Sequence, residues 1–103
     1  MIRVMGLYHW ADGAHFDAAL YADEHAALTR RLLTPLGLQR LELARFLGAG
    51  APRPGELIAA TFADFPDLAS AQAALAAAGP ELAAHVSRYS SLQPQIRLCE
   101  LLA

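Results

Sequence analysis

Apolar residues follow two different periods along this chain, and the alternation of the two predicts the order of its elements. Residues 2–9 are largely apolar and partly β-branched, and the loop 10–13 follows them, which predicts a first strand. From Ala18 to Leu33 the apolar positions recur with the 3.6-residue period of an amphipathic helix. The chain therefore begins with a strand followed by a helix.

Local signals mark both ends of this first helix. Asp17 is a suitable N-cap, and Phe16 before it can pack on Tyr21 as a hydrophobic staple. The segment 34–37 predicts the end of the helix. Its proline disfavours helical backbone in the preceding residue, and its glycine is a typical residue just after the end of a helix. The predicted core-facing stripe consists of Tyr21, His25, Leu28 and Leu32.

The rest of the chain predicts two strands, a second helix and a last strand. The strands are expected at Leu38–Leu47 and Leu57–Phe62, separated by a loop with three glycines and two prolines. Asp64 or Asp67 can cap a helix from about Pro66 to Ala78. Gly79-Pro80 is expected to break that helix, leaving a short helical segment at 81–86, and Gln95–Leu101 is expected to be the fourth strand.

This β-α-β-β-α-β order predicts one α+β domain over residues 1–103, with the ferredoxin-like fold of a four-stranded antiparallel sheet and two helices on one face. Alternation within the first strand places Val4 and Tyr8 on one face and Met5 and Leu7 on the other. Apolar residues are thus expected on both faces, although helices cover only one. A second copy is the simplest cover for the other face, which predicts a homodimer with two-fold symmetry.

Composition narrows the classes of function. The apolar fraction is 55%, the net charge is −2, and all eight basic residues are scattered arginines, which argues against nucleic acid and anionic membranes as partners. The lack of lysine excludes a Schiff base. The lone Cys99 is expected to be a buried structural thiol in a reducing compartment. Neither a signal peptide nor a membrane-spanning run is recognisable, so a cytoplasmic protein is expected.

Four histidines are the main candidates for chemistry, and they are His9, His15, His25 and His85. A three-histidine metal site is conceivable, but none of them has the close helical spacing of many metal motifs, and no metal or cofactor is predicted. His25 is either a histidine held in the core by a neighbour or the acid/base of a cleft.

Phosphate-binding loops, nucleophile elbows and paired cysteines are all missing. What remains is a small apolar pocket edged by histidine and tyrosine, which suits an apolar carbonyl, lactone or phenolic ligand. His85 and Tyr89, four residues apart, can line the same cleft, and Trp10 can act as its lid or contact the second copy. Tyr89 is alternatively a core residue.

The sequence resembles the EthD family of small dimeric α/β-barrel proteins. The resemblance covers nearly the whole chain, and the motifs that carry it are Leu7-Tyr8, Phe16-Asp17-x3-Tyr21-x3-His25, Ala60-x-Phe62, and Val86, Tyr89, Pro94 and Ile96. It implies a ferredoxin-like protomer that pairs through its sheet, and a cleft between sheet and helices. The histidine of the family's helix corresponds to His25. The family's aspartate is replaced by His85, which changes the charge of the site.

The leading hypothesis is a cytoplasmic homodimer that binds a small apolar ligand and catalyses cofactor-free proton transfer, as a lyase, isomerase or cyclase. Its acid/base is His25, with Tyr21 as a hydrogen-bond donor and His85 as a partner. The ligand contacts are expected from His9, Trp10 and Tyr89. One alternative is a non-catalytic accessory or carrier protein for an oxygenase system, and another is a small monooxygenase.

Overall fold

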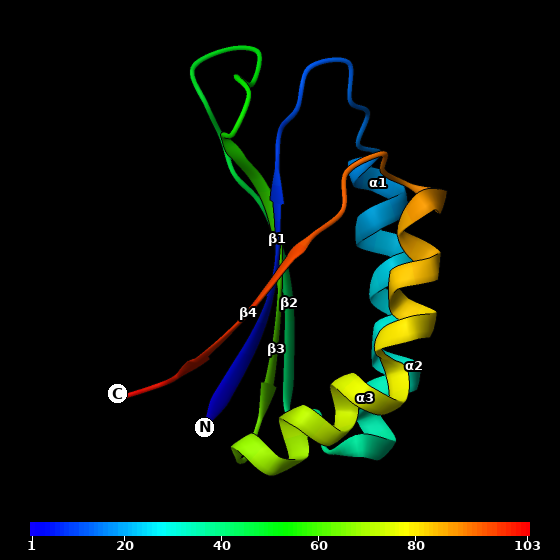
Figure 1. Cartoon of the computed structure of the whole chain (residues 1–103), viewed down its shortest axis with the longest axis vertical. Helices are drawn as coiled ribbons and strands as arrows, with labels where there is room; N and C mark the ends of the chain where they lie inside the picture. The colour runs from blue at the N-terminus through cyan, green and yellow to red at the C-terminus, as the bar shows by residue number, and fades with distance from the viewer.

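The computed structural model describes residues 1–103 and has one antiparallel sheet with all its helices on one face (Figure 1). The sheet order is β2-β3-β1-β4. The strands are β1 (Ile2–His9), β2 (Arg40–Arg45), β3 (Leu57–Phe65) and β4 (Gln95–Glu100). The ferredoxin-like order predicted from the sequence is therefore confirmed. None of the helices combines the length and the apolar character that crossing a membrane requires.

The first helical rod starts and stops at the predicted signals. Its successive parts are α1 (Ala18–Leu20), the π-helical turn η1 (Tyr21–His25), α2 (Ala26–Leu33) and the 3-10 turn η2 (Thr34–Leu36). The carboxylate of Asp17 accepts a hydrogen bond from the backbone N–H of Leu20 at 3.1 Å, as an N-cap does. Gly37 ends the rod with a φ of 104°, a conformation that glycine adopts without steric cost.

The π-helical turn changes which side chains of this rod are buried. The buried residues are Tyr21, His25, Ala26, Thr29 and Leu33. Leu28 and Leu32, which were predicted on the stripe, are only half-buried. In an ideal α-helix each four-residue step drifts by about 40° around the axis, whereas a π turn takes up about one extra residue. The extra residue in η1 offsets this drift once, so Thr29 and not Leu28 continues the buried face of Tyr21 and His25.

The second helix does not break at Gly79-Pro80, contrary to the sequence prediction. α3 runs from Leu68 to His85 with Pro80 inside it, and the 3-10 turn η3 (Val86–Arg88) follows. Proline removes one backbone hydrogen bond and bends a helix. α3 is bent in Figure 1, and its second arm runs alongside the first helical rod. Burial of alanines before the proline and of Val86 after it offsets the cost of the bend.

Asp67, not Asp64, caps α3, and its carboxylate accepts from the backbone N–H of Ser70 at 2.8 Å. Asp64 belongs to β3, which continues three residues beyond the predicted end because it pairs with the start of β1. β2 is shorter than predicted and lies within the expected range.

The sheet buries its helix-facing side chains in two clusters. One gathers Val4, Leu33, Ala63, Phe65, Ala71, Ala74 and Ala78. The other gathers Tyr8, Tyr21, Ala59, Val86, Tyr89 and Leu92. Residues of both clusters line the cavity that is described below.

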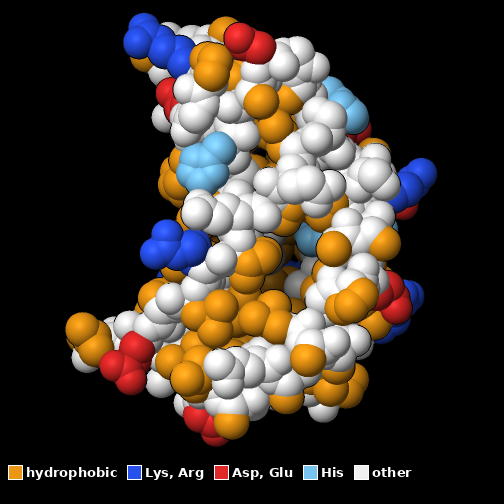
Figure 2. Space-filling model, viewed as in Figure 1, with side chains coloured by type: hydrophobic (Ala, Val, Ile, Leu, Met, Phe, Trp, Pro, Cys, Tyr) orange, Lys and Arg blue, Asp and Glu red, His pale blue; other side chains and the backbone are white.

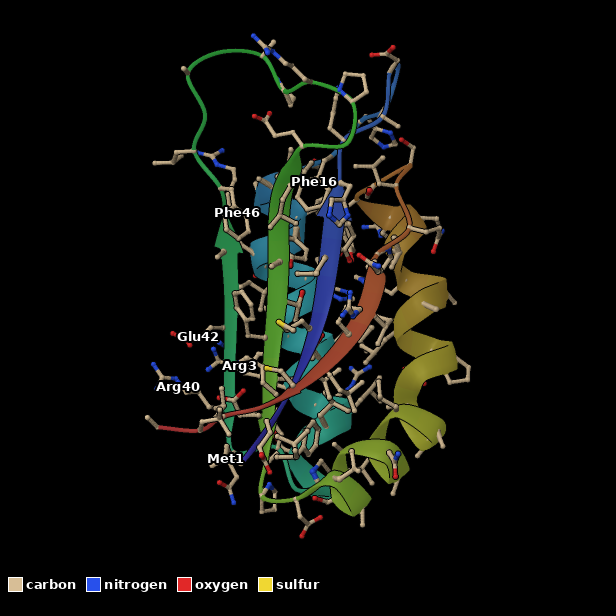
Figure 3. The ribbon with its side chains drawn as sticks, turned by 60° about the vertical axis from the view of Figure 1, so that its left-hand side comes forward. Met1, Arg3, Phe16, Arg40, Glu42 and Phe46 are labelled. Carbon is tan, nitrogen blue, oxygen red and sulfur yellow. The ribbon has the colours of Figure 1, made fainter.

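The open face of the sheet is less apolar than the sequence pattern predicts. Met5 and Leu7 lie there half-buried, but they share the face with charged side chains that point away from the helices in Figure 3. Arg3 donates to both carboxylate oxygens of Asp64, at 2.7 and 2.9 Å, and its guanidinium lies 5.3 Å from the ring centre of Phe62. Pairing with Asp64 neutralises much of the charge that Arg3 brings to this face.

Candidate functional site

A cavity of about 210 Å³ lies between the sheet and the helices. Its position corresponds to the hollow in Figure 2, where hydrophobic side chains form the floor. Much of the lining is aliphatic or aromatic, including Val4, Leu33, Phe65, Leu75, Leu82 and Ile96. Ile96 is 50% exposed because β4 is the outer strand of the sheet.

The polar part of the lining contains no charged residue. It consists of Tyr8, His25, Thr29, Thr61 and Gln93. The hydroxyl of Thr29 already donates to the backbone carbonyl of His25 at 2.6 Å. No arginine, aspartate or glutamate faces the cavity, so nothing there would balance the charge of an ionic ligand. The lining therefore favours a neutral molecule.

Two imidazoles connect this cavity to the outside of the helical layer. His25 comes from the π turn and His85 from the last residue of α3, and their Nδ1 atoms are 3.0 Å apart. The rings are stacked, with centroids 5.3 Å apart. His25 lines the cavity and is 5% exposed, whereas His85 is half-buried and does not line it. The bend in α3 makes this meeting possible, because it lays the end of the helix against η1.

Burial, together with the charge of His85, lowers the pKa of His25 from 6.5 to about 4. His25 is therefore neutral at pH 7, and one hydrogen lies between the two Nδ1 atoms. When both rings are neutral, the imidazole that donates this hydrogen keeps an unprotonated Nε2, and the other carries Nε2–H. The pair can thus accept a proton at one end and release one at the other.

Beside this pair, four hydroxyl side chains form two hydrogen-bonded pairs. Tyr21 stacks on His25 with ring centroids 5.8 Å apart, and its hydroxyl lies 2.5 Å from Oγ1 of Thr61. The hydroxyls of Tyr8 and Tyr89 form the second hydrogen bond. Tyr8 and Thr61 line the cavity, whereas Tyr21 and Tyr89 lie behind them.

The sequence pattern pointed to the two rear tyrosines as site residues but not to the two front hydroxyls. A signal for both was present in the alternation of the strands. Tyr8 is on the same face of β1 as Val4, and Thr61 stands on β3 between Ala59 and Ala63, which share its face. A polar side chain on a buried face needs a partner, and this marks Thr61.

The other residues proposed from the sequence lie elsewhere. His9 is exposed at an irregularity at the end of β1. Trp10 lines a separate groove of about 450 Å³, together with Phe16 and Phe46. His15 is exposed, and no three metal-binding side chains come together in the chain. Of the four histidines, only His25 and His85 meet.

Comparison with known proteins identifies the architecture. No family model and no curated protein matches this sequence. An EthD-like protein from Ralstonia eutropha JMP134 superposes with a TM-score of 0.82 at 21% identity, over 99% of this chain and 92% of the other. This chain has the EthD-like fold.

Two further solved structures share the EthD-like fold to a lower degree. An ethyl tert-butyl ether D (EthD) family protein from Bacillus halodurans C-125 has a TM-score of 0.66 and 19% identity over 99% of both chains. An antibiotic biosynthesis monooxygenase has a TM-score of 0.51 and 14% identity over both full chains. The fold agrees with the resemblance that the sequence motifs carry, and the chemistry has to be argued from the side chains.

Proposed function

We propose that this chain is a member of the EthD family that binds a small neutral ligand in the cavity and catalyses cofactor-free proton transfer on it. The observation that carries the proposal is the hydrogen-bonded pair of His25 and His85, which joins an apolar cavity to the half-exposed end of α3. The expected reaction class is that of a lyase, isomerase or cyclase.

The cavity limits the size and charge of the ligand. Pockets for drug-sized ligands have volumes of roughly 300–1,000 Å³, and a cavity of about 150 Å³ holds benzene. A volume of about 210 Å³ therefore suits one ring with a short substituent. The uncharged lining and the neutral His25 favour a carbonyl, lactone or phenolic compound over a carboxylate.

In the proposed reaction His25 takes a proton from a carbon next to a carbonyl group. Its Nε2 accepts the proton, the C–H electron pair moves into a new carbon–carbon double bond, and the carbonyl oxygen takes up the displaced pair. The Nδ1 hydrogen of His25 then passes to Nδ1 of His85, which releases its own Nε2 hydrogen to water. Because the pKa of His25 is lowered, His25 passes this proton on readily. Tyr21 positions His25 by stacking on its ring.

The open face of the sheet is the proposed interface of a homodimer. Helices cover only one face, and Met5, Leu7 and Phe62 lie half-buried on the other, where no helix covers them (Figure 1). A two-fold axis through this face would bring the same residues of two copies together. Sedimentation velocity at micromolar concentration tests this, with a dimer expected for the wild type and a monomer for Phe62→Glu. A monomeric wild type would contradict it.

The proton-transfer proposal is tested by hydrogen–deuterium exchange of a model ketone. Acetophenone in D₂O is followed by proton NMR as its methyl signal decays, with the background rate subtracted. The wild type is expected to accelerate exchange, His25→Ala to abolish the acceleration, and His85→Asn to reduce it. His9→Asn, which alters an exposed histidine outside the cavity, is the matched control and should retain the wild-type rate.

Equal exchange rates in wild type and His25→Ala would refute the acid/base role. Gly6→Ala provides a second, independent variant. A methyl group on Gly6 would stand 3.7 Å from Pro94 and 3.9 Å from Ile96, so it fits without a clash but occupies cavity space. Slower exchange in Gly6→Ala, with unchanged stability, would place the reaction in the cavity.

A further inference from the structure

The two hydroxyl pairs behind the cavity have a common arrangement. In each pair one member lines the cavity, as Tyr8 and Thr61 do, and the other lies behind it, as Tyr89 and Tyr21 do. Tyr8 and Tyr89 are fully buried and Tyr21 is nearly so, and Tyr8 differs from the two rear tyrosines because it borders the cavity. The hydroxyl of each rear tyrosine has the front hydroxyl as its only hydrogen-bond partner.

The direction of these hydrogen bonds follows from counting hydrogens. Each pair has two hydroxyl hydrogens, and only one of them can lie between the two oxygens. If the front hydroxyl donated, the hydrogen of the rear tyrosine would be buried without an acceptor, at a substantial free-energy cost. If the rear tyrosine donates, the remaining hydrogen belongs to the front hydroxyl and can face the cavity. The second arrangement satisfies every group once an acceptor is bound.

We infer that Tyr8 and Thr61 form a two-donor site for one oxygen atom of the bound ligand, with Tyr89 and Tyr21 as positioning residues behind them. This inference rests on the proposed function, and it names the group of the ligand that the site recognises. The oxygen is a neutral carbonyl oxygen that gains negative charge when His25 removes a proton from the adjacent carbon.

The position of the two donors on the sheet fits this role. Tyr8 on β1 is paired with Ala59 on β3, and Gly6 is paired with Thr61, so the two front side chains are diagonal neighbours on the helix-facing side. Gly6 brings no side chain between them. Two donors on adjacent strands can therefore converge on one atom, and a rigid sheet holds them there before the ligand arrives.

The hydroxyls keep their hydrogens at neutral pH. Burial raises the pKa of Tyr8 to about 12, and burial also raises the pKa of Tyr21 and Tyr89. They therefore act as donors and not as bases. In each pair the rear hydroxyl polarises the front one, which strengthens the hydrogen bond that the front hydroxyl makes to the ligand.

A pair of probes that differ only in the oxygen tests the inference. Acetophenone presents a carbonyl group, and ethylbenzene has a similar shape without one. Binding of each is measured by calorimetry, and the carbonyl stretch of bound acetophenone is measured by infrared spectroscopy. Wild-type protein should bind acetophenone more tightly and shift its carbonyl stretch to lower frequency than in hexane.

Removal of a front hydroxyl should affect only the oxygen-bearing probe. Tyr8→Phe and Thr61→Val are each expected to weaken acetophenone binding about 5- to 10-fold, the effect of one lost hydrogen bond. Ethylbenzene affinity should stay within about twofold of the wild type, since ethylbenzene has no oxygen that could accept a hydrogen bond from either hydroxyl. In Tyr89→Phe the carbonyl stretch of bound acetophenone should move part of the way back toward its frequency in hexane, although Tyr8 keeps its donor hydroxyl. A purely structural role of Tyr89 would not produce this effect.

The possible failures are distinguishable. If the wild type binds both probes equally and the carbonyl stretch is unshifted, the two-donor site is overturned while the binding cavity stands. If Tyr8→Phe and Thr61→Val weaken both probes alike, the hydroxyls act only through packing and the inference is also overturned. If the wild type binds neither probe, the cavity is not a binding site, and the two-donor site is refuted together with the proposed function.

Discussion

The buried histidine predicts how the stability of this protein depends on pH. The pKa of His25 is lowered from 6.5 to about 4 by burial and by the charge of His85. Between these two values the unfolded chain binds a proton at this position and the folded chain does not. Stability therefore rises with pH across this window, being fully present above about pH 6.5 and lost as the pH falls toward 4.

The magnitude follows from the size of the shift. A lowering of the pKa by about 2.5 units corresponds to about 3 kcal/mol over the whole window. Between pH 8 and pH 5, wild-type protein should lose about 2 kcal/mol of unfolding free energy through His25 alone. The lowered pKa values of Asp64 and Asp67 contribute in the same direction only below their ordinary value of 3.8, as the pH falls toward the lowered values.

Urea unfolding at several pH values between 5 and 8 measures this dependence. The perturbation is His25→Asn, which removes the titrating group. Whatever its absolute stability, the variant should lose about 2 kcal/mol less of its free energy of unfolding than the wild type does between pH 8 and pH 5. His9→Asn, which changes an exposed histidine, is the matched control and should reproduce the wild-type slope.

Parallel pH profiles for wild type and His25→Asn would refute this reasoning. So would an NMR titration of the imidazole of His25 with a midpoint near 6.5 in the folded protein. Either result would mean that the ring is open to water, and then the apolar cavity could not hold it neutral.

Three further outcomes are expected. His85→Asn should raise the pKa of His25, because it removes the charge of the neighbouring imidazole, and an NMR titration measures the shift. Asp64→Asn should lower the free energy of unfolding in urea by about 2 kcal/mol, because it weakens the two charge-assisted hydrogen bonds from Arg3. The exposed control Glu42→Gln should change this free energy by less than about 0.5 kcal/mol. Gly37→Ala should cost about 1 kcal/mol, measured in the same way, because its φ of 104° strains any residue with a Cβ atom, and an unchanged midpoint would contradict this.

Much of the fold could be predicted from the sequence because short-range interactions decide it. The alternation in residues 2–9 defined β1, and Asp17 and Gly37 marked the ends of the first helical rod. These signals act through capping hydrogen bonds, steric limits on the backbone and the period of apolar residues, which are all properties of neighbours along the chain. The four-residue spacing of Tyr21 and His25 likewise brought their rings together.

The errors in the sequence prediction have a physical cause as well. Pro80 looked like a helix end because it removes a backbone hydrogen bond, but the buried alanines before it and the packing of Leu82 and Val86 after it compensate for that loss. Leu28 looked buried because an ideal α-helix was assumed, and the π turn moved Thr29 into that position. Neither result could be read from local preference.

The sequence by itself determined the order of the elements and placed His25 on the buried face of its helix. Only the tertiary structure decided what His25 meets. His85 is 60 residues away along the chain, and the pairs Tyr8–Tyr89 and Tyr21–Thr61 span 81 and 40 residues. Such contacts depend on how the bent α3 packs against the first helical rod and the sheet. That arrangement is set by the packing of the whole core, which no stretch of neighbouring residues encodes.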